Sequence, residues 1–451
     1  MRLHDIFFWF ACFFLVGVLV ASIAAGFAHP YWISELLVFI LSAVFLVVRR
    51  KSLVASSKLF VVGRSLFVVL SLALGVAYFF TFDVLYKSDP PPYGQKVVFS
   101  GIVSDQEQRI DNQKLVVSNI QIATPRYPEY KYGDEIKVTG VIKTIEGDWE
   151  NYFKKENIAG LMGFPEIELI SRGNGSKIKS ALLEVKGFFI SSFRKVFPFD
   201  KAAFMSGLVL GETAEFSDEF KEKLRATGTS HLVALSGYNI AIIASTVSSL
   251  LGLWWFTKRF TFAGSTLLIF AFVLMTGGEA SVVRAAIMGF LVLLADKFRR
   301  VYHFRNAVAF TALAMVVVNP KVLAFDIGFQ LSFMALIGIT YLKPWLEKRL
   351  KWEGRAGIIN WRQNLLTTSA AQVAVLPVIL YHFGTFSPIG VLANVLILEF
   401  IPLTMSFGFF IAFAAMISTP LAWIISWPAS ILMGYELGVI DLCYRIINLF
   451  I

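Results

Sequence analysis

Charged side chains are scarce in this sequence. Asp, Glu, Lys and Arg make up 16% of its 451 residues, whereas a soluble domain carries about 25%. Hydrophobic residues make up 57% and include 44 phenylalanines. This composition excludes a soluble enzyme, a secreted disulfide-stapled domain and a disordered chain. The apolar residues form runs of about 20, enough to cross roughly 30 Å of hydrocarbon, so the sequence predicts a polytopic α-helical membrane protein.

Motifs for metal binding and nucleotide hydrolysis are also missing. The two cysteines, Cys12 and Cys443, lie inside apolar runs and form no ligand cluster. The five histidines lie far apart in the sequence, so no histidine-rich metal site is expected. No Gly-x-x-x-x-Gly-Lys-Ser/Thr run is present. We therefore expect no cofactor, no metal and no enzymatic activity, and any energy would come from a partner.

Apolar runs predict eleven membrane spans, three in residues 1–88 and eight in residues 228–451. Lys and Arg gather in alternate loops between them, which places the N-terminus in the cytoplasm and residue 83 outside. The net charge of +10 lies largely in these loops and does not by itself indicate an anionic ligand. Pro402 and Pro428 are expected to break or kink the last two spans. The predicted spans are 6–28, 32–48, 59–82, 232–253, 261–276, 282–295, 305–318, 323–342, 364–382, 388–416 and 421–447.

A polar insert, residues 89–171, separates the two groups of spans. Its runs 95–104, 114–123 and 135–145 are rich in Val, Ile and Thr and are bounded by turn residues, as in antiparallel strands. Four or five short strands suit a small OB-like β-barrel on the extracytoplasmic side. Residues 83–171 carry 10 basic against 14 acidic side chains, a net charge of −4.

Residues 172–227 connect the insert to the second group of spans. Residues 176–197 predict a basic amphipathic helix, which either lies in the membrane interface or packs on the β-domain. Ser217 is expected to cap a second, short helix that Gly228 closes in a left-handed conformation.

Polar side chains at the start of one predicted span form the first candidate site. His231, Ser236 and Asn239 stand at the start of the span 232–253. They could form a hydrolase with Ser236 as nucleophile and His231 as base, line a polar path, or bond to neighbouring helices. No acid nearby in the sequence would orient the histidine, so a path lining is favoured over catalysis.

Further polar side chains lie inside spans, where each costs about 2.5–3.5 kcal/mol on insertion scales if it faces lipid. Arg284 either snorkels outward or faces a water-filled interior and meets a phosphate. Asp326 and Gln330 are four apart and are expected to share a helix face, with Arg284 as a candidate partner of Asp326. Asn394 and Glu399 precede Pro402, where an interrupted helix could line a cavity; Glu399 could equally be a paired structural carboxylate.

The order of several motifs resembles that of the ComEC competence-channel family. The resemblance covers about 200–420 strongly, and the order of spans followed by a small β-domain matches more weakly. The sequence has Tyr238-Asn239 where the family commonly has Leu-His. The similar segments are Leu208-Val209-Leu210-Gly211-Glu212, Gly228 to Gly237, Ser281 to Met288, Asn319-Pro320, Asp326 to Phe333, and Phe383 to Asn394.

The resemblance implies an inner-membrane channel through which single-stranded DNA enters the cytoplasm during natural transformation. It also implies a DNA-contacting OB-like domain, a periplasmic DNA receptor and a cytoplasmic DNA motor as partners, besides the lipid bilayer. Many family members add a metallo-β-lactamase-like domain, but no His-x-His-x-Asp-His run is present, so a short form is expected. The alternative is a carrier or channel for another solute, or an intramembrane enzyme using His231 and Ser236. The path candidates are His231, Ser236, Asn239, Arg284, Asp326, Gln330, Asn394 and Glu399.

Overall fold

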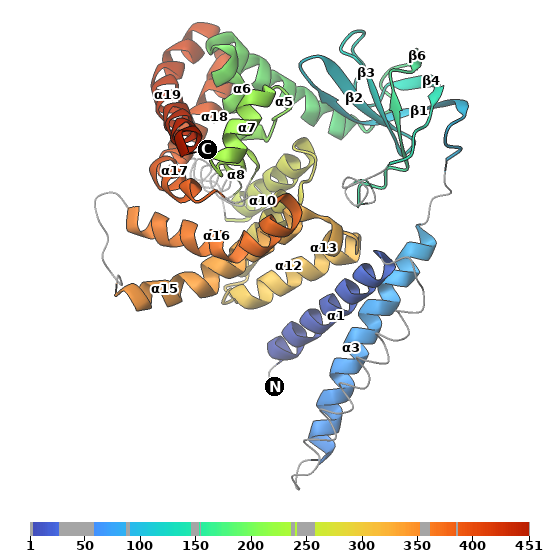
Figure 1. Ribbon diagram of the computed structural model, residues 1–451, viewed down its shortest axis with the longest axis vertical. Helices are drawn as coiled ribbons and strands as arrows, with labels where there is room; N and C mark the ends of the chain where they lie inside the picture. Colours follow the sequence, from blue (N-terminus) through green and yellow to red (C-terminus); the bar gives the residue numbers. More distant parts are fainter. Residues whose placement is uncertain are drawn as a thin grey trace. The chain divides into compact units, whose positions relative to one another are not determined.

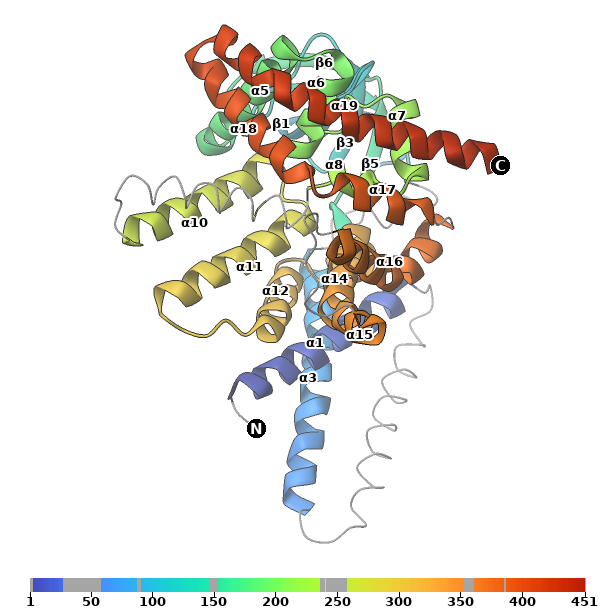
Figure 2. The ribbon, with the colours of Figure 1, turned by 90° about the vertical axis from the view of Figure 1, so that its left-hand side faces the viewer.

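The computed structural model forms two compact units (Figures 1 and 2). The first unit comprises Met1–Pro90, Glu146–Ala159 and Phe290–Ile327, and the second comprises Pro91–Ile145, Gly160–Gly289 and Gly328–Ile451. The structure describes residues 3–26, 58–86, 91–145, 153, 155–235, 240, 258–351, 361–384 and 387–450.

Two long helices, α1 (Leu3–Gly26) and α3 (Lys58–Leu85), pack against each other in the first unit. Gly17 lies so close to Leu72 that an added Cβ would collide with its backbone carbonyl, and Gly75 stands in the same relation to Phe14. Small residues let membrane helices approach this closely. The hydroxyl of Tyr78 also donates to a carbonyl of α12 (Phe304–Val318), which is followed by the short α13 (Val322–Phe325).

The insert folds as a six-stranded mixed sheet in the order β5-β3-β2-β1-β4-β6. All paired neighbours are antiparallel except β3 and β5, which are parallel. Its core contains Val103, Leu115, Ile122 and Val138. The strands are β1 (Lys96–Gln108), β2 (Asn112–Val117), β3 (Ile120–Pro125), β4 (Glu135–Val141), β5 (Gly160–Gly163) and β6 (Glu166–Ser171).

The expectation of one strand over 114–123 is wrong. Ser118 and Asn119 have φ values of 49° and 64° and turn the chain between β2 and β3. Two successive left-handed residues form the tight turn that suits a two-residue hairpin. The apolar character of the flanking residues hid this turn in the sequence.

Four helices follow the sheet: α5 (Lys177–Val196), α6 (Phe199–Leu210), α7 (Asp218–Ala226) and α8 (Ser230–Val233). The ammonium of Lys179, near the start of α5, donates to the carbonyl of Ser104 in β1. Further along α5, Phe189 packs 6.2 and 6.1 Å from the rings of Phe409 and Phe413. Helix α5 therefore packs on the β-domain at one end and on helical neighbours at the other, in line with the second of its two expected placements.

Several helices, α1 and α3 among them, are long and apolar enough to cross a membrane. Within the described residues five helices pass on length and composition, or six if the bent pair α17–α18 is one span. The predicted span 32–48, and most of 232–253, lie outside the described residues, so the count of eleven stays a prediction. The helices not yet named are α10 (Lys258–Met275), α11 (Ala280–Lys297), α14 (Ile327–Ile337), the π-helix η1 (Gly338–Leu342), α15 (Lys343–Leu350), α16 (Trp361–Phe383), α17 (Ile389–Ile397), α18 (Ile401–Ile417) and α19 (Thr419–Phe450).

The two proline-containing spans behave differently. The run 388–416 is broken, since α17 and α18 meet at an angle of 51° next to Pro402. The run 421–447 is continuous, because α19 passes through Pro428 without a break. A proline in the first turn of a helix costs no internal hydrogen bond, which is why the break falls before Pro402.

Candidate functional site

The end of α6 depends on a glycine. Gly211 has a φ of 71°, and an added Cβ there would lie 2.7 Å from Cγ and Cδ1 of Leu235. A side chain at this position would therefore need an unfavourable backbone conformation and would displace Leu235. The glycine brings α6 against the segment that carries the first candidate site.

Two acids after α6 hold α5 in place. The Glu212 carboxylate lies 2.7 Å from Nζ of Lys186, and the carboxylate of Glu215 forms an ion pair with Arg194. Both partners lie on α5. Glu212, which belongs to the first family-like motif, thus positions a helix. Its role was missed in the sequence because the basic residues of α5 had no assigned partners.

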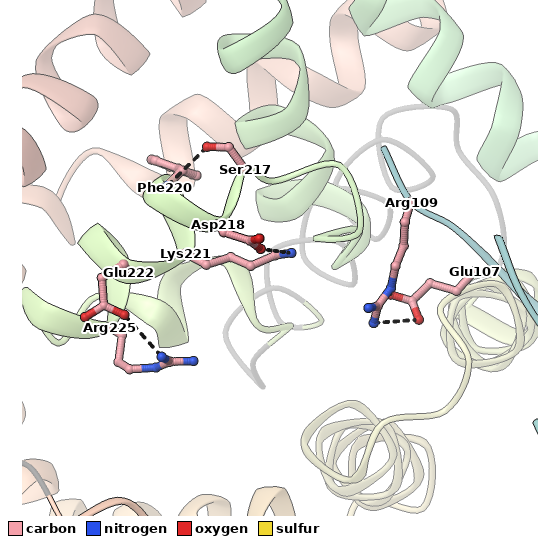
Figure 3. Close-up of polar contacts among 8 residues, drawn as sticks. All are labelled: Glu107, Arg109, Ser217, Asp218, Phe220, Lys221, Glu222 and Arg225. Atoms are coloured by element: carbon pink, nitrogen blue, oxygen red, sulfur yellow. Dashed lines mark hydrogen bonds and ion pairs between the residues drawn. The ribbon is translucent and has the colours of Figure 1, made fainter. Parts of the chain in front are cut away.

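Helix α7 follows the same motif and is fixed at both ends. Ser217 caps it by accepting a hydrogen bond from the backbone NH of Phe220 at 3.2 Å, as predicted (Figure 3). Near its other end, Lys223 lies 3.0 Å from Asp441 of α19. Hydrogen bonds to Asp441 and then to Glu219 raise the pKa of Lys223. The next turn closes at Gly228, whose φ of 63° is left-handed as expected.

Basic side chains of the β-domain and of α7 influence one another through their charges. We call Arg109, Lys114 and Lys221 the basic edge. Burial, followed by the charges of Arg109 and Lys221, lowers the pKa of Lys114, while Glu107 opposes the shift. Arg109 is bonded to Glu107, and Lys221 is paired with Asp218 (Figure 3). Although the insert is acidic overall, the charges of Arg109 and Lys221 both act on Lys114 at this edge.

Motifs that lie far apart in the sequence meet near α8. The hydroxyl of Ser281, in the segment Ser281 to Met288, donates to the carbonyl of Leu235, in the segment Gly228 to Gly237. An added Cβ at Gly228 would lie 3.3 Å from Cα of Gly390, in the last motif. His231 lies on α8 with an exposed side chain. Ser236 and Asn239 lie outside the described residues.

Helix α14 carries Gln330 and is contacted by Arg284. The guanidinium carbon of Arg284 lies 6.0 Å from the ring centre of Phe333, and its Nε is buried without a hydrogen-bond partner among the described residues. Three residues earlier on α14, Oε1 of Gln330 lies 3.3 Å from Nε2 of His382. His382 was not among the sequence candidates, although it ends a predicted span.

Asp326 does not share a helix face with Gln330, so that prediction is wrong. It lies between α13 and α14 in an extended conformation, with φ −98° and ψ 102°. Asp disfavours the helix interior because its side chain competes for backbone groups, which suits it to such a break.

The ion-pair partner that the structure gives Asp326 is Lys155, whereas the sequence suggested Arg284. Nζ of Lys155 lies 2.9 Å from the carboxylate of Asp326, which is 6% exposed. Burial lowers the pKa of Lys155, but the charges and hydrogen bonds of Asp326 and Glu156 together outweigh it and hold that pKa above its ordinary value. The side chain of Asn319 donates to the backbone carbonyl of Lys155 at 3.2 Å. Asn319 and Asp326, which both lie in family-like segments, therefore bind the segment that connects β4 to β5.

The last two candidates lie at helix α17. Oε2 of Glu399, at the break before α18, accepts a 2.6 Å hydrogen bond from Asn364 of α16. Asn394 is 1% exposed, and both polar atoms of its amide lack partners among the described residues. Asn364 went unnoticed in the sequence, although polar residues recur four positions apart at Asn364, Thr368 and Gln372 in the first half of the predicted span 364–382.

Comparisons with known proteins agree with the motif order. The family described as Competence protein matches residues 208–449. ComE operon protein 3 of Bacillus subtilis (strain 168) is 26% identical over 281 residues, which are 59% of this chain and 34% of that protein. The chain thus spans about a third of this relative's length. No solved structure matches. The chain is a helical membrane protein with a β-domain, and it belongs to the Competence protein family that its motifs predicted.

Proposed function

We propose that this protein is the inner-membrane channel through which single-stranded DNA enters the cytoplasm during natural transformation. The observation that carries the proposal is the convergence of three family motifs near α8, through Ser281 with Leu235 and Gly228 with Gly390. All four residues fall inside the segment that matches the Competence protein family. Packing of distant motifs around one point is what a shared path through the helices requires.

The proposed path is lined by the polar candidates His231, Ser236, Asn239, Arg284, Gln330, Asn394 and Glu399. Arg284 has the clearest chemical role, because its Nε is a buried donor without a partner. A phosphate oxygen would satisfy this donor with a charge-assisted hydrogen bond. Gln330 on α14 and His382 on α16 lie 3.3 Å apart and offer further hydrogen bonds.

The basic edge supports DNA binding at the β-domain, which we propose to be OB-like and extracytoplasmic. Arg109, Lys114 and Lys221 bring positive charge together although the insert is acidic. Such an edge would attract the phosphates of an incoming strand, and binding would weaken with added salt. We further propose a cytoplasmic N-terminus, a periplasmic DNA receptor and a cytoplasmic DNA motor as partners, and no enzymatic activity in this chain.

Complementation of a deletion strain tests the channel. The wild-type gene is expected to restore DNA uptake, and Arg284→Ala to lower it by roughly tenfold to a hundredfold, as the loss of a charged hydrogen bond of about 1.5–3 kcal/mol implies. Arg349→Ala, at the end of α15, is the matched control and should leave uptake unchanged. Normal uptake in the deletion strain would contradict the proposal. Labelling of Ser236 by a serine-reactive probe would favour the intramembrane enzyme instead.

A binding titration on the full-length protein in lipid nanodiscs tests the basic edge. Lys114→Ala and Lys221→Ala are each expected to weaken binding of single-stranded DNA and to reduce the slope of log affinity against log salt by about 0.7, the value for one lost contact to a single strand. Lys96→Ala, at the start of β1, provides the control. An unchanged slope in both variants would show that the basic edge does not bind phosphate.

A further inference from the structure

Four polar atoms of α16 and α17 are buried without hydrogen-bond partners among the described residues. They are the hydroxyl of Thr368, Oε1 of Gln372 and both amide atoms of Asn394. Thr368 is 6% exposed and Asn394 is 1% exposed. Native proteins leave few buried polar groups unpaired, because each loses its bonds to water and gains nothing in return. Several such atoms at one helix interface therefore require a cause.

The unpaired atoms follow a regular line between two antiparallel helices. At one end the amide of Asn364 bonds to Glu399, and at the other an added Cβ on Gly390 would lie 3.2 Å from Nε2 of Gln372. Side chains four apart share a helix face. Thr368 is therefore on the face of α16 that carries Asn364 and Gln372, and Asn394 is on the face of α17 that carries Gly390. We call these six residues the polar seam; α16 and α17 are labelled in Figure 2.

One end of the polar seam lies against the turn at Thr227 and Gly228. An added Cβ at Gly390 would lie 3.1 Å from the carbonyl oxygen of Thr227 and 3.4 Å from Cα of Gly228. Gly228 and Gly390 face each other at this point, so neither places a side chain between the two segments. The seam thus begins at the turn where the motifs converge and runs along α16 toward the break between α17 and α18.

The chemistry of the seam suits bases rather than phosphates. It contains hydroxyl and carboxamide groups and one carboxylate, Glu399, but no Lys or Arg. Carboxamides both donate and accept hydrogen bonds, as the edges of all four bases do. A phosphate would instead seek a cation such as Arg284. The 51° bend between α17 and α18 provides a point about which α17 can move.

We propose that the polar seam is the line along which α16 and α17 separate to admit DNA, and that Thr368, Gln372 and Asn394 then hydrogen-bond the bases of the passing strand and the water around it. In the closed state these polar atoms have no partners among the described residues. In the open state the bases and the water around the strand supply them. This inference rests on the proposed function.

The first test replaces the unpaired groups by apolar groups of similar shape. Thr368→Val and Asn394→Leu are expected to raise the thermal unfolding midpoint of the purified protein by about 2–4 °C and to lower DNA uptake at least tenfold. Thr311→Val is the matched control, since the buried hydroxyl of Thr311 on α12 donates to the carbonyl of Ala307 at 2.7 Å. It should leave uptake unchanged and should not raise the midpoint. Lower midpoints in both seam variants, with normal uptake, would overturn the proposal.

The second test locks the seam. Asn364→Cys with Glu399→Cys, in a Cys12→Ser, Cys443→Ala background, is treated with a short thiol cross-linker that a reductant cleaves. Cross-linking is expected to stop uptake, and reduction to restore it to the rate of the untreated variant. The control pair is Lys223→Cys with Asp441→Cys, whose wild-type side chains also meet across two helices at 3.0 Å. Cross-linking this pair should leave uptake at its untreated rate.

The outcomes separate the two proposals. A wild-type gene that fails to restore uptake to the deletion strain would overturn the channel function. Restored uptake by the wild type, together with undiminished uptake through a cross-linked seam, would overturn the seam alone. Stabilisation of the protein by Na⁺ or K⁺ that disappears in Asn394→Leu would identify a resident cation in place of DNA bases and would also overturn the seam proposal.

Discussion

The helices of the pairs α1–α3 and α16–α17 both approach closely at glycines, but the two pairs differ in whether their buried polar groups are hydrogen-bonded. Between α1 and α3, Gly17 and Gly75 meet backbone, and the buried hydroxyls of Ser22 and Ser71 donate to carbonyls four residues earlier in their own helices. Between α16 and α17, the buried groups of Thr368 and Asn394 have no partner among the described residues. The buried polar groups of the α1–α3 pair are hydrogen-bonded in the arrangement seen here, whereas those of the α16–α17 pair have no partners among the described residues.

Disrupting the packing of α1 against α3 should give the largest loss of stability. Gly17→Leu places a side chain against the backbone of Leu72 and is expected to cost about 3 kcal/mol or more, the upper range for overpacking. The protein level in membranes and the unfolding midpoint in detergent measure this loss. Gly438→Ala, on α19 with nothing within 4 Å of an added Cβ, is the control and should stabilise slightly. Equal protein levels of the Gly17→Leu variant and the wild type would show that the packing of α1 against α3 does not depend on the close approach at Gly17.

A paired buried group should respond with the opposite sign to an unpaired one. Asp326→Asn removes the charge that faces Lys155 at 2.9 Å and is expected to cost about 1–3 kcal/mol, less than for a fully buried pair because Lys155 is partly exposed. Thermal unfolding of the purified protein measures the change. Asn394→Leu, which removes unpaired atoms, is expected to stabilise in the same assay. Destabilisation of similar size in both variants would show that the two sites do not differ in kind.

The pH dependence of the Lys155–Asp326 pair sharpens the same contrast. The pKa of Lys155 is raised in the folded protein above its ordinary value of 10.5, so its contribution to stability is complete below pH 10.5 and is lost as the pH rises through the folded pKa. The difference in unfolding free energy between wild type and Lys155→Met should therefore stay constant from pH 7 to about pH 10. A difference that already shrinks near neutral pH would contradict this ion pair.

The smallest effect is expected for polar groups satisfied within their own helix. Ser71→Ala removes a hydroxyl that bonds to the carbonyl of Phe67, and Ala has the higher helix propensity, so the two changes nearly cancel within about 0.5 kcal/mol. Thermal unfolding should place Ser71→Ala close to wild type. A clear loss of stability would show that this hydroxyl has a further role between α1 and α3.

The sequence predicted the local features of the fold best. Alternation and turn residues located the sheet, and the cap at Ser217 and the left-handed Gly228 followed from residue type alone. The turn at Ser118 and Asn119 was missed because apolar residues continue on both sides of it. Local preferences predict such features because they act over a few residues.

The candidate site was predicted less completely, because its partners come from distant elements. Lys155 lies in a connection between two strands, and no periodicity relates it to Asp326. The polar residues Asn364, Thr368 and Gln372 are visible in the sequence at intervals of four, but the face they meet on α17 depends on how α16 packs. Sequence periodicity defines a helix face, and tertiary packing decides what that face contacts.

Helix α5 has a mechanical consequence. Lys179 fixes one end to the sheet through Ser104, and Arg194 fixes the other to Glu215. At 1.5 Å per residue the two anchors stand about 22 Å apart. Such a rod acts as a lever: a tilt of about 10° around the Glu215 end would carry the Lys179 end through roughly 4 Å. A pull on the β-domain would thus reach Phe189 and the rings of α18 as torque, without any loosening of the sheet itself.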